Sequence, residues 1–123
     1  MKAIFINSKE QSVHEIELST NQEARMAEMY DRLECRMFEI GQYFNNGDVL
    51  FVDEEGLLTA TNESMFFSIN NNQPLIGNGL ILGDEVDLDN GSYTINDHLT
   101  KIESLNIKFL NMETIKEILM DIS

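Results

Sequence analysis

The stretch that decides the fold runs from residue 46 to residue 60 and is NGDVLFVDEEGLLTA. It contains the dipeptide Asn46-Gly47, an apolar run at 49–52, consecutive acids at 53–55, and a second apolar run at 57–60. Asn-Gly supplies the two positive backbone angles of a tight hairpin turn, and short apolar runs bounded by turn residues are typical of strands. The stretch therefore predicts antiparallel strands at 49–52 and 57–60, joined by a turn at Glu54-Glu55-Gly56.

The same pattern continues on both sides of this stretch. Two further Asn-Gly dipeptides, Asn78-Gly79 and Asn90-Gly91, adjoin strand candidates at 80–82 and 92–94. Near the start, residues 2–7 form an apolar strand candidate, and residues 13–18 alternate apolar and polar side chains as a half-buried strand does. The middle of the chain, from Met37 onward, is therefore expected to be mostly antiparallel sheet.

Helices are predicted at both ends of the chain. Thr20 and Glu23 have the spacing of a capping box, and apolar residues then recur at helical spacing, which predicts a helix over 21–34. A final helix is expected from about Met112, with Asn111 as its cap. A short helix capped by Asn96 or Thr94 is expected between these two. The apolar positions expected to be buried are Met26, Met29 or Tyr30, and Leu33 in the first helix, Leu99 and Ile102 in the short one, and Ile115, Ile118, Leu119 and Ile122 in the last.

Together these patterns predict one α+β domain spanning residues 1–123. A curved antiparallel sheet of about five to seven strands would be packed by two or three helices. The chain of 123 residues, 42% of them hydrophobic, is long enough to bury one core without disulfides. Its one cysteine, Cys35, excludes an internal disulfide and fits a reducing, cytoplasmic setting. The apolar run at 3–6 is too short for a signal peptide or a membrane span.

The charge of the chain is concentrated in its middle. The formal net charge is -14, and residues 37–100 contain eleven carboxylates and no lysine or arginine. Binding to a nucleic-acid backbone requires clustered cations, and the same repulsion disfavours anionic membrane surfaces. We therefore expect no direct contact with nucleic acid or membrane, and a partner with a basic surface.

The order of several elements resembles a known family. These elements are the acidic turn Asp53-Glu54-Glu55-Gly56-Leu57-Leu58, the pair Ile69-Asn70, the glycine-bearing segment Ile76-Gly77-Asn78-Gly79-Leu80-Ile81-Leu82-Gly83 and the segment Tyr93-Thr94-Ile95-Asn96-Asp97. The chain is similar over residues 1–105 to a small family of phage and mobile-element proteins known as domain of unknown function 3846. The resemblance implies a compact α+β fold and an accessory role in a virus or plasmid. It brings no catalytic residues to carry over.

Candidate sites for metal, phosphate and catalysis each have a simpler interpretation. The run from Gly83 to Gly91 is rich in acids, but the register of a calcium-binding loop places Val86 and Leu88 where carboxylates are needed. A strand with one solvent-exposed face is therefore favoured. Gly77, Gly79 and Gly83 lack the helix that a phosphate-binding loop requires. His14, His98, Ser64, Ser68 and Cys35 form no recognisable catalytic set. We therefore expect a non-enzymatic protein without cofactor or metal; a metal-assisted hydrolase using the acids at 84–89 remains an alternative.

The aromatic run Met65-Phe66-Phe67-Ser68-Ile69 has two interpretations. In the simpler one Met65, Phe67 and Ile69 face the core and Phe66 half-covers an edge. In the other, Phe66 lies in a protein interface, where aromatic residues are enriched.

The acidic middle also has two interpretations. It is either a solvated surface or a pattern of carboxylates that imitates nucleic-acid phosphates and occupies the basic groove of a host defence enzyme. The residues expected to bind such a partner are Asp53, Glu54, Glu55, Asp84, Glu85, Asp87 and Asp89. The alternative function is an oligomer that binds or sequesters a small ligand such as a nucleotide signal.

Overall fold

The computed structural model describes the backbone of residues 1–83, 85–87, 93–95 and 102–122, and the side chains of residues 1–83 and 102–118. The predicted turn at Asn90-Gly91 and most of the predicted short helix, including Asn96 and Leu99, lie outside these residues. Ile102 begins a single 3-10 turn.

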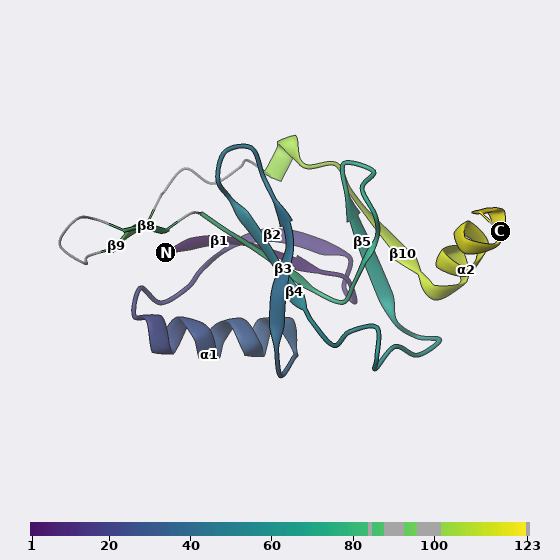
Figure 1. Ribbon diagram of the computed structural model, residues 1–123, viewed down its shortest axis with the longest axis horizontal. Helices are drawn as coiled ribbons and strands as arrows, with labels where there is room; N and C mark the ends of the chain where they lie inside the picture. The colour runs from purple at the N-terminus through teal and green to yellow at the C-terminus, as the bar shows by residue number, and fades with distance from the viewer. Residues whose placement is uncertain (84, 88–92, 96–101, 123) are drawn as a thin grey trace.

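The described chain is α+β, as predicted (Figure 1). In chain order its elements are β1 (Lys2–Asn7), β2 (Ser12–Glu17), α1 (Gln22–Leu33), β3 (Phe38–Tyr43), β4 (Val49–Asp53), β5 (Met65–Ile69), β6 (Leu75–Ile76), β7 (Gly79–Leu82), β8 (Glu85–Asp87), β9 (Tyr93–Ile95), η1 (Ile102–Ser104), β10 (Ile107–Asn111) and α2 (Met112–Ile122). Sheet A has five strands in the order β2-β1-β7-β4-β3, and sheet B has the order β10-β5-β6. β8 pairs with β9, and every described pairing is antiparallel.

Sheet A is apolar on both faces because a different layer covers each of them. Along β1, Ile4 and Ile6 belong to a core cluster that includes Phe67 and Ile69 of sheet B. The alternate residues Ala3 and Phe5 pack with Met29 and Leu33 of α1 instead. Successive side chains of a strand point to opposite faces, so sheet A lies between α1 and sheet B. Phe66 is also buried, which excludes it from a surface interface.

The predicted strand at 57–60 is wrong. β4 is paired on one side with β3 and on the other with β7, so both of its hydrogen-bonding edges are used. Residues 54–59 form turns instead. The first Asn-Gly dipeptide does join two strands, β3 and β4. Within this dipeptide only Gly47, and not Asn46, adopts a positive φ, of 93°. This is the geometry of a hairpin turn that ends in a left-handed glycine rather than of a two-residue turn.

The dipeptide Asn78-Gly79 does not form a hairpin turn. β6 and β7 are not paired with each other, and Gly77 rather than Gly79 has the positive φ, of 82°. The Asn78 side chain is buried and hydrogen-bonds to backbone groups of two other elements. Its role is therefore to connect elements and not to reverse the chain.

The two predicted helices are present, with local differences. The cap of α1 is Asn21, whose side chain accepts a hydrogen bond from the N–H of Ala24, so the predicted Thr20–Glu23 capping box is wrong by one residue. Asn111 caps α2 as predicted, accepting from the N–H of Thr114 at 2.8 Å. Met26 is 38% exposed and Ile118 is 39% exposed, contrary to the burial predicted for both. The side chains of Leu119 and Ile122 lie outside the described ones. Within the described part of the chain, neither helix has the length and apolarity to cross a bilayer.

Candidate functional site

The acidic turn after β4 is fixed by local hydrogen bonds. Asp53 ends β4, and its Oδ1 accepts from the N–H of Glu55 at 2.9 Å. The N–H of Glu54 donates to the backbone oxygen of Met37 at 3.0 Å, beside the start of β3. Gly56 is buried, and a Cβ there would lie 2.4 Å from Cγ2 of Ile76. The turn therefore has a defined backbone, and its carboxylates extend from a fixed frame.

Glu34 comes to this turn from the end of α1. It follows the last residue of the helix with a φ of 51° and a ψ of 48°, and its N–H donates to the oxygen of Asp31. Glycine usually occupies this left-handed position, because a side chain there is unfavourable. Glu34 and Asp31 also place negative charge at the negative end of the helix dipole, where Arg32 of the last turn supplies one opposing positive charge. The fold therefore contains two unfavourable features at Glu34 that a glycine would avoid.

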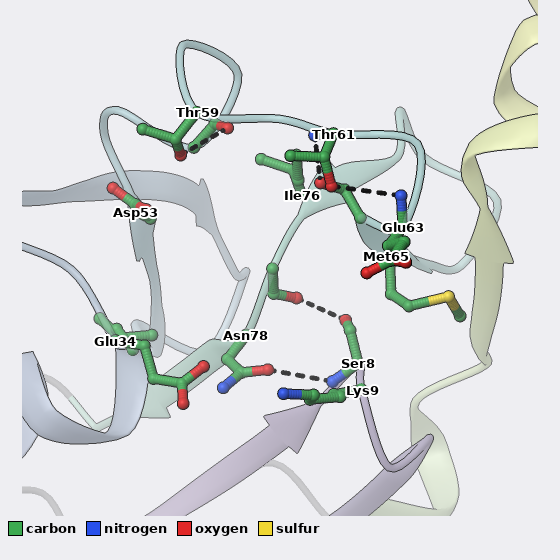
Figure 2. A pocket seen from close by; sticks show the side chains of 14 residues that line it. Ser8, Lys9, Glu34, Asp53, Thr59, Thr61, Glu63, Met65, Ile76 and Asn78 are labelled. Atoms are coloured by element: carbon green, nitrogen blue, oxygen red, sulfur yellow. Dashed lines mark hydrogen bonds between the residues drawn. The ribbon is translucent and has the colours of Figure 1, made fainter.

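A hollow of about 320 Å³ lies between this helix end, the turn after β1 and the loop from 56 to 65 (Figure 2). Figure 2 shows the carboxyl-bearing side chains of Glu34, Asp53 and Glu63 around it, with Lys9 beside Ser8 and Asn78 at its base. The uncharged lining residues are Ser8, Leu33, Gly56, Thr59, Thr61, Ser64, Met65, Ile76, Gly77 and Asn78. We call this the first hollow.

A second hollow of about 450 Å³ shares Glu34, Asp53 and Thr59 with the first. Its remaining lining residues are Tyr30, Asp31, Cys35, Arg36 and Glu55. The five carboxylates that line the two hollows are Asp31, Glu34, Asp53, Glu55 and Glu63, and we call them the acidic rim.

Two cations lie among these carboxylates. Lys9 lines the first hollow, and Arg36 forms an ion pair with Glu55 at 2.9 Å in the second. Arg36 lies one residue before the stretch that lacks basic residues, so the sequence pattern alone did not indicate this neutralisation. Because Arg36 is largely exposed, solvent screens the pair and its contribution to stability is small. Five carboxylates against two cations still leave the rim negative.

The field of the rim acts on Cys35. Burial raises the pKa of the Cys35 thiol above its ordinary value of 9.0, and the Asp53 and Glu55 carboxylates raise that pKa further. The thiol is therefore protonated at neutral pH and is a poor nucleophile. Its pKa provides an internal probe of the negative potential at the rim.

Exposed leucines follow the acidic turn directly. Leu57 is 74% exposed and Leu58 is 83% exposed. They lie between Gly56 and Thr59, both of which line the first hollow. Large apolar side chains beside charged ones are typical of protein interfaces, in which an apolar centre is surrounded by a polar border.

The structure brings together only part of the predicted partner-binding set. Asp53 and Glu55 lie in the acidic rim, whereas Glu54 is exposed and lines neither hollow. Asp84 and Asp89 lie outside the described residues, and Glu85 and Asp87 lie in β8, whose side chains are not among the described ones.

Sequence reasoning missed three of the rim residues, Asp31, Glu34 and Glu63. Two acids in the last turn of a predicted helix, where cations are favoured, were a signal that could have identified Asp31 and Glu34. No comparable signal marked Glu63.

The chemistry of the rim suits cationic groups. Among the described residues, no group of three possible metal ligands is close enough to hold an ion. The hydroxyl of Ser64, in the first hollow, accepts a hydrogen bond from the N–H of Thr61, which is a structural contact. Carboxylates at fixed positions around a hollow accept hydrogen bonds from ammonium and guanidinium groups. The geometry therefore favours lysine and arginine side chains as occupants.

Comparison with known proteins identifies a family. Residues 1–105 match the family described as "Domain of unknown function (DUF3846)". No curated protein and no solved structure matches the chain. The whole acidic rim lies within the matched residues, whereas β10 and α2 lie beyond them.

Proposed function

Because this chain belongs to the DUF3846 family, which brings no catalytic residue set with it, we propose that it is a non-enzymatic binding protein whose acidic rim binds a basic surface of a partner protein. The partner is one whose basic groove ordinarily holds nucleic acid, and occupation of that groove inhibits it. In the phage or mobile-element setting that the resemblance implies, such a partner is a host defence enzyme.

The observation that carries the proposal is the placement of Glu34. It contributes a carboxylate to both hollows, although its backbone angle and its place at the helix end are each unfavourable. Strained residues persist where the surrounding structure holds them, and they cluster at functional sites. A role in binding explains why an acid occupies a position where glycine is favoured.

The exposed pair Leu57 and Leu58 supports a macromolecular partner. A binding surface for one small cation would not need apolar side chains beside it. A protein surface that covers both the rim and the leucines would bury apolar area and pair the charges in the same contact. Attraction between opposite charges would then set the association rate and make binding weaker as salt rises.

The rim does not favour a nucleotide ligand. The first hollow is large enough for a small molecule, but Glu34, Asp53 and Glu63 line it with one nearby cation, Lys9. A phosphate group there would be repelled by three carboxylates. The described hollows therefore provide no observation in favour of nucleotide sequestration.

The test compares two neutralised variants with the same net charge. The rim variant carries Glu34→Asn, Asp53→Asn and Glu63→Gln. Asn tolerates the left-handed angle at 34 and keeps an acceptor for the N–H of Glu55 at 53. The control variant carries Glu10→Gln, Glu23→Gln and Glu117→Gln, all at exposed positions.

Tagged full-length protein is used to capture partners from the native host at low salt. We expect the wild type and the control to retain a partner that salt and added duplex DNA both release, and the rim variant to lose it. Equal retention by the rim and control variants would contradict the proposal, because binding would then follow net charge and not the rim.

A further inference from the structure

An apolar groove borders the acidic rim but shares no lining residue with either of its two hollows. α1 packs against Ala3 and Phe5 of β1 and Leu80 and Leu82 of β7, and the ring of its Tyr30 lies 4.9 Å from that of Phe38 at the start of β3. Beyond this contact α1 covers the same face of sheet A only in part, since Val49 and Phe51 of β4 are half-buried. A hollow of about 310 Å³ is present there, next to α1. Its apolar lining side chains are Met1, Met26, Met29, Phe38, Val49, Phe51 and Leu82, and we call it the apolar groove.

Exposed side chains of the edge strand extend this groove. Ile40 is paired with Phe51, and Tyr43 is paired with Val49, so each lies on the same face as a groove residue. Ile40 is 43% exposed and Tyr43 is 72% exposed. Apolar side chains on an edge strand favour docking of another chain.

The groove also differs from the rest of the molecule in charge. None of its described lining residues carries a carboxylate, and its charged side chain is Arg25. In a chain with a net charge of -14, a surface without carboxylates lets a second, equally acidic copy approach with less repulsion than a surface lined by them.

The chain also supplies an apolar helix face that its own fold covers only in part, since Ile115 is half-buried and Ile118 is 39% exposed. α2 continues directly from β10, and none of its described side chains, at 112–118, is buried. Ile115 and Ile118 are one turn apart and lie on the same face of the helix. Figure 1 shows α2 and the C-terminus beyond β10 at one end of the long axis, with α1 toward the other end. Within one molecule, α2 therefore does not cover the apolar groove.

We propose that α2 of a second copy docks in the apolar groove and that the exchange is reciprocal, which gives a symmetric dimer. An eleven-residue helix is about 16 Å long and a six-residue strand about 20 Å, so α2 fits along β3. Docking of an amphipathic helix into a groove uses anchors spaced as Ile115 and Ile118 are. A reciprocal exchange buries two such contacts in each dimer.

Salt distinguishes this contact from partner binding at the rim. Two chains of charge -14 repel each other, and added salt screens this repulsion while leaving the apolar contact intact. The dimer should therefore become more stable as salt rises, whereas partner binding at the rim should weaken. Failure of one proposal leaves the other standing.

The test measures molecular mass by light scattering and sedimentation over a range of concentrations and salt. Met26→Glu disables the groove and Ile118→Glu disables the helix, both at exposed positions where the fold tolerates a charge. Met37→Glu is the matched control, because Met37 is 53% exposed and lines neither the groove nor the two acidic hollows. We expect the wild type and Met37→Glu to dimerise, and each of the other two variants alone to stay monomeric.

Mixing the two disabled variants gives the sharpest result. The Met26→Glu chain has an intact helix and the Ile118→Glu chain has an intact groove, so a mixed dimer regains one of its two contacts. We expect an excess of mixed dimer over either variant alone. A wild type that is monomeric at all concentrations and salts, a dimer unaffected by Ile118→Glu, absence of rescue on mixing, or a groove occupied by a different protein or a small apolar molecule would each overturn the proposal.

Discussion

The side-chain oxygen of Asn78 accepts a hydrogen bond from the backbone N–H of Ser8 at 3.1 Å. The amide nitrogen of the same side chain donates to the backbone oxygen of Arg32 at 3.0 Å. One buried amide thus connects the segment before β7 to the end of β1, as Figure 2 shows, and to the last turn of α1. These segments form the base of the first hollow, so Asn78 positions the site as well as stabilising the fold.

Asn78→Ala should therefore reduce the free energy of unfolding by about 1–3 kcal/mol, because it leaves the buried N–H of Ser8 without its partner. The measurement is urea unfolding at pH 7. Asn72→Ala is the matched control: Asn72 is exposed and bonds to Gln42 at 3.3 Å, so its loss should change stability by less than about 0.5 kcal/mol. Similar effects for the two variants would contradict the role given to Asn78.

Gly79 and Gly77 should respond to alanine for different reasons. A Cβ at Gly79 would lie 2.7 Å from Cζ of the buried Phe67, and such overpacking reduces stability by about 1–3 kcal/mol. At Gly77 nothing lies within 4 Å, but the φ of 82° makes Gly77→Ala unfavourable by about 1 kcal/mol.

A double-mutant cycle separates the two causes. Phe67→Leu should partly compensate Gly79→Ala, since it removes the atom that the new Cβ meets, and it should add independently to Gly77→Ala. Additive effects in both pairs would show that the contact between Gly79 and Phe67 does not limit stability.

Glu34→Asn should stabilise the protein while weakening partner capture. Asn tolerates the left-handed angle and removes a negative charge from the end of α1, so the free energy of unfolding should rise by about 0.5–1.5 kcal/mol. Glu34→Ala removes the charge but keeps the unfavourable backbone angle, so its free energy of unfolding should rise by less than that of Glu34→Asn. High salt should reduce the charge contribution and leave the difference between Asn and Ala, measured by urea unfolding, unchanged. An alanine variant as stable as the asparagine variant would contradict this.

Asp53→Asn should make Cys35 react faster with an alkylating reagent. Burial and then the Asp53 carboxylate raise the pKa of the thiol, so removing that charge lowers the pKa and increases the thiolate fraction at pH 7. The chain has one cysteine, so the rate reports a single site. The ratio of variant to wild-type rates should shrink as the pH rises above the thiol pKa. Glu10→Gln is the control, and an equal increase for it would rule out a local effect.

Glu28→Gln should remove a stabilising contribution that depends on pH. Hydrogen bonds from the Ser19 side chain and its N–H hold the pKa of Glu28 below the ordinary value of 4.5. A carboxyl group whose pKa is lower in the folded state stabilises the fold at pH values above its ordinary pKa of 4.5. This contribution is lost as the pH falls through the folded-state pKa.

The wild type should therefore exceed Glu28→Gln in unfolding midpoint at pH 7, and the difference should shrink between pH 5 and the acid limit of folding. Urea unfolding at a series of pH values measures this. A difference independent of pH would mean that the loss comes from packing rather than from the charge.

Local patterns in the sequence were sufficient for most elements of the fold. The apolar run at 49–52 is a strand in the structure, and Asn111 caps α2, because each depends on residues that are neighbours in the chain. The strand predicted at 57–60 is not formed, because β3 and β7, the latter distant in the chain, pair with both edges of β4. The hairpin turn predicted at Asn78-Gly79 is not formed, because the buried amide of Asn78 binds backbone groups that lie far away in the sequence.

The sequence by itself determined the α+β class, the family and the sign of the charge, since these follow from composition and from short-range order. Only the tertiary structure decided which carboxylates share a surface. It brought Glu34 from a helix end and Glu63 from a loop to the hollow that Asp53 lines, and it placed Arg36 against Glu55. The physical reason is that charge interactions depend on distances in space, and the packing of α1 and the loop against sheet A sets those distances.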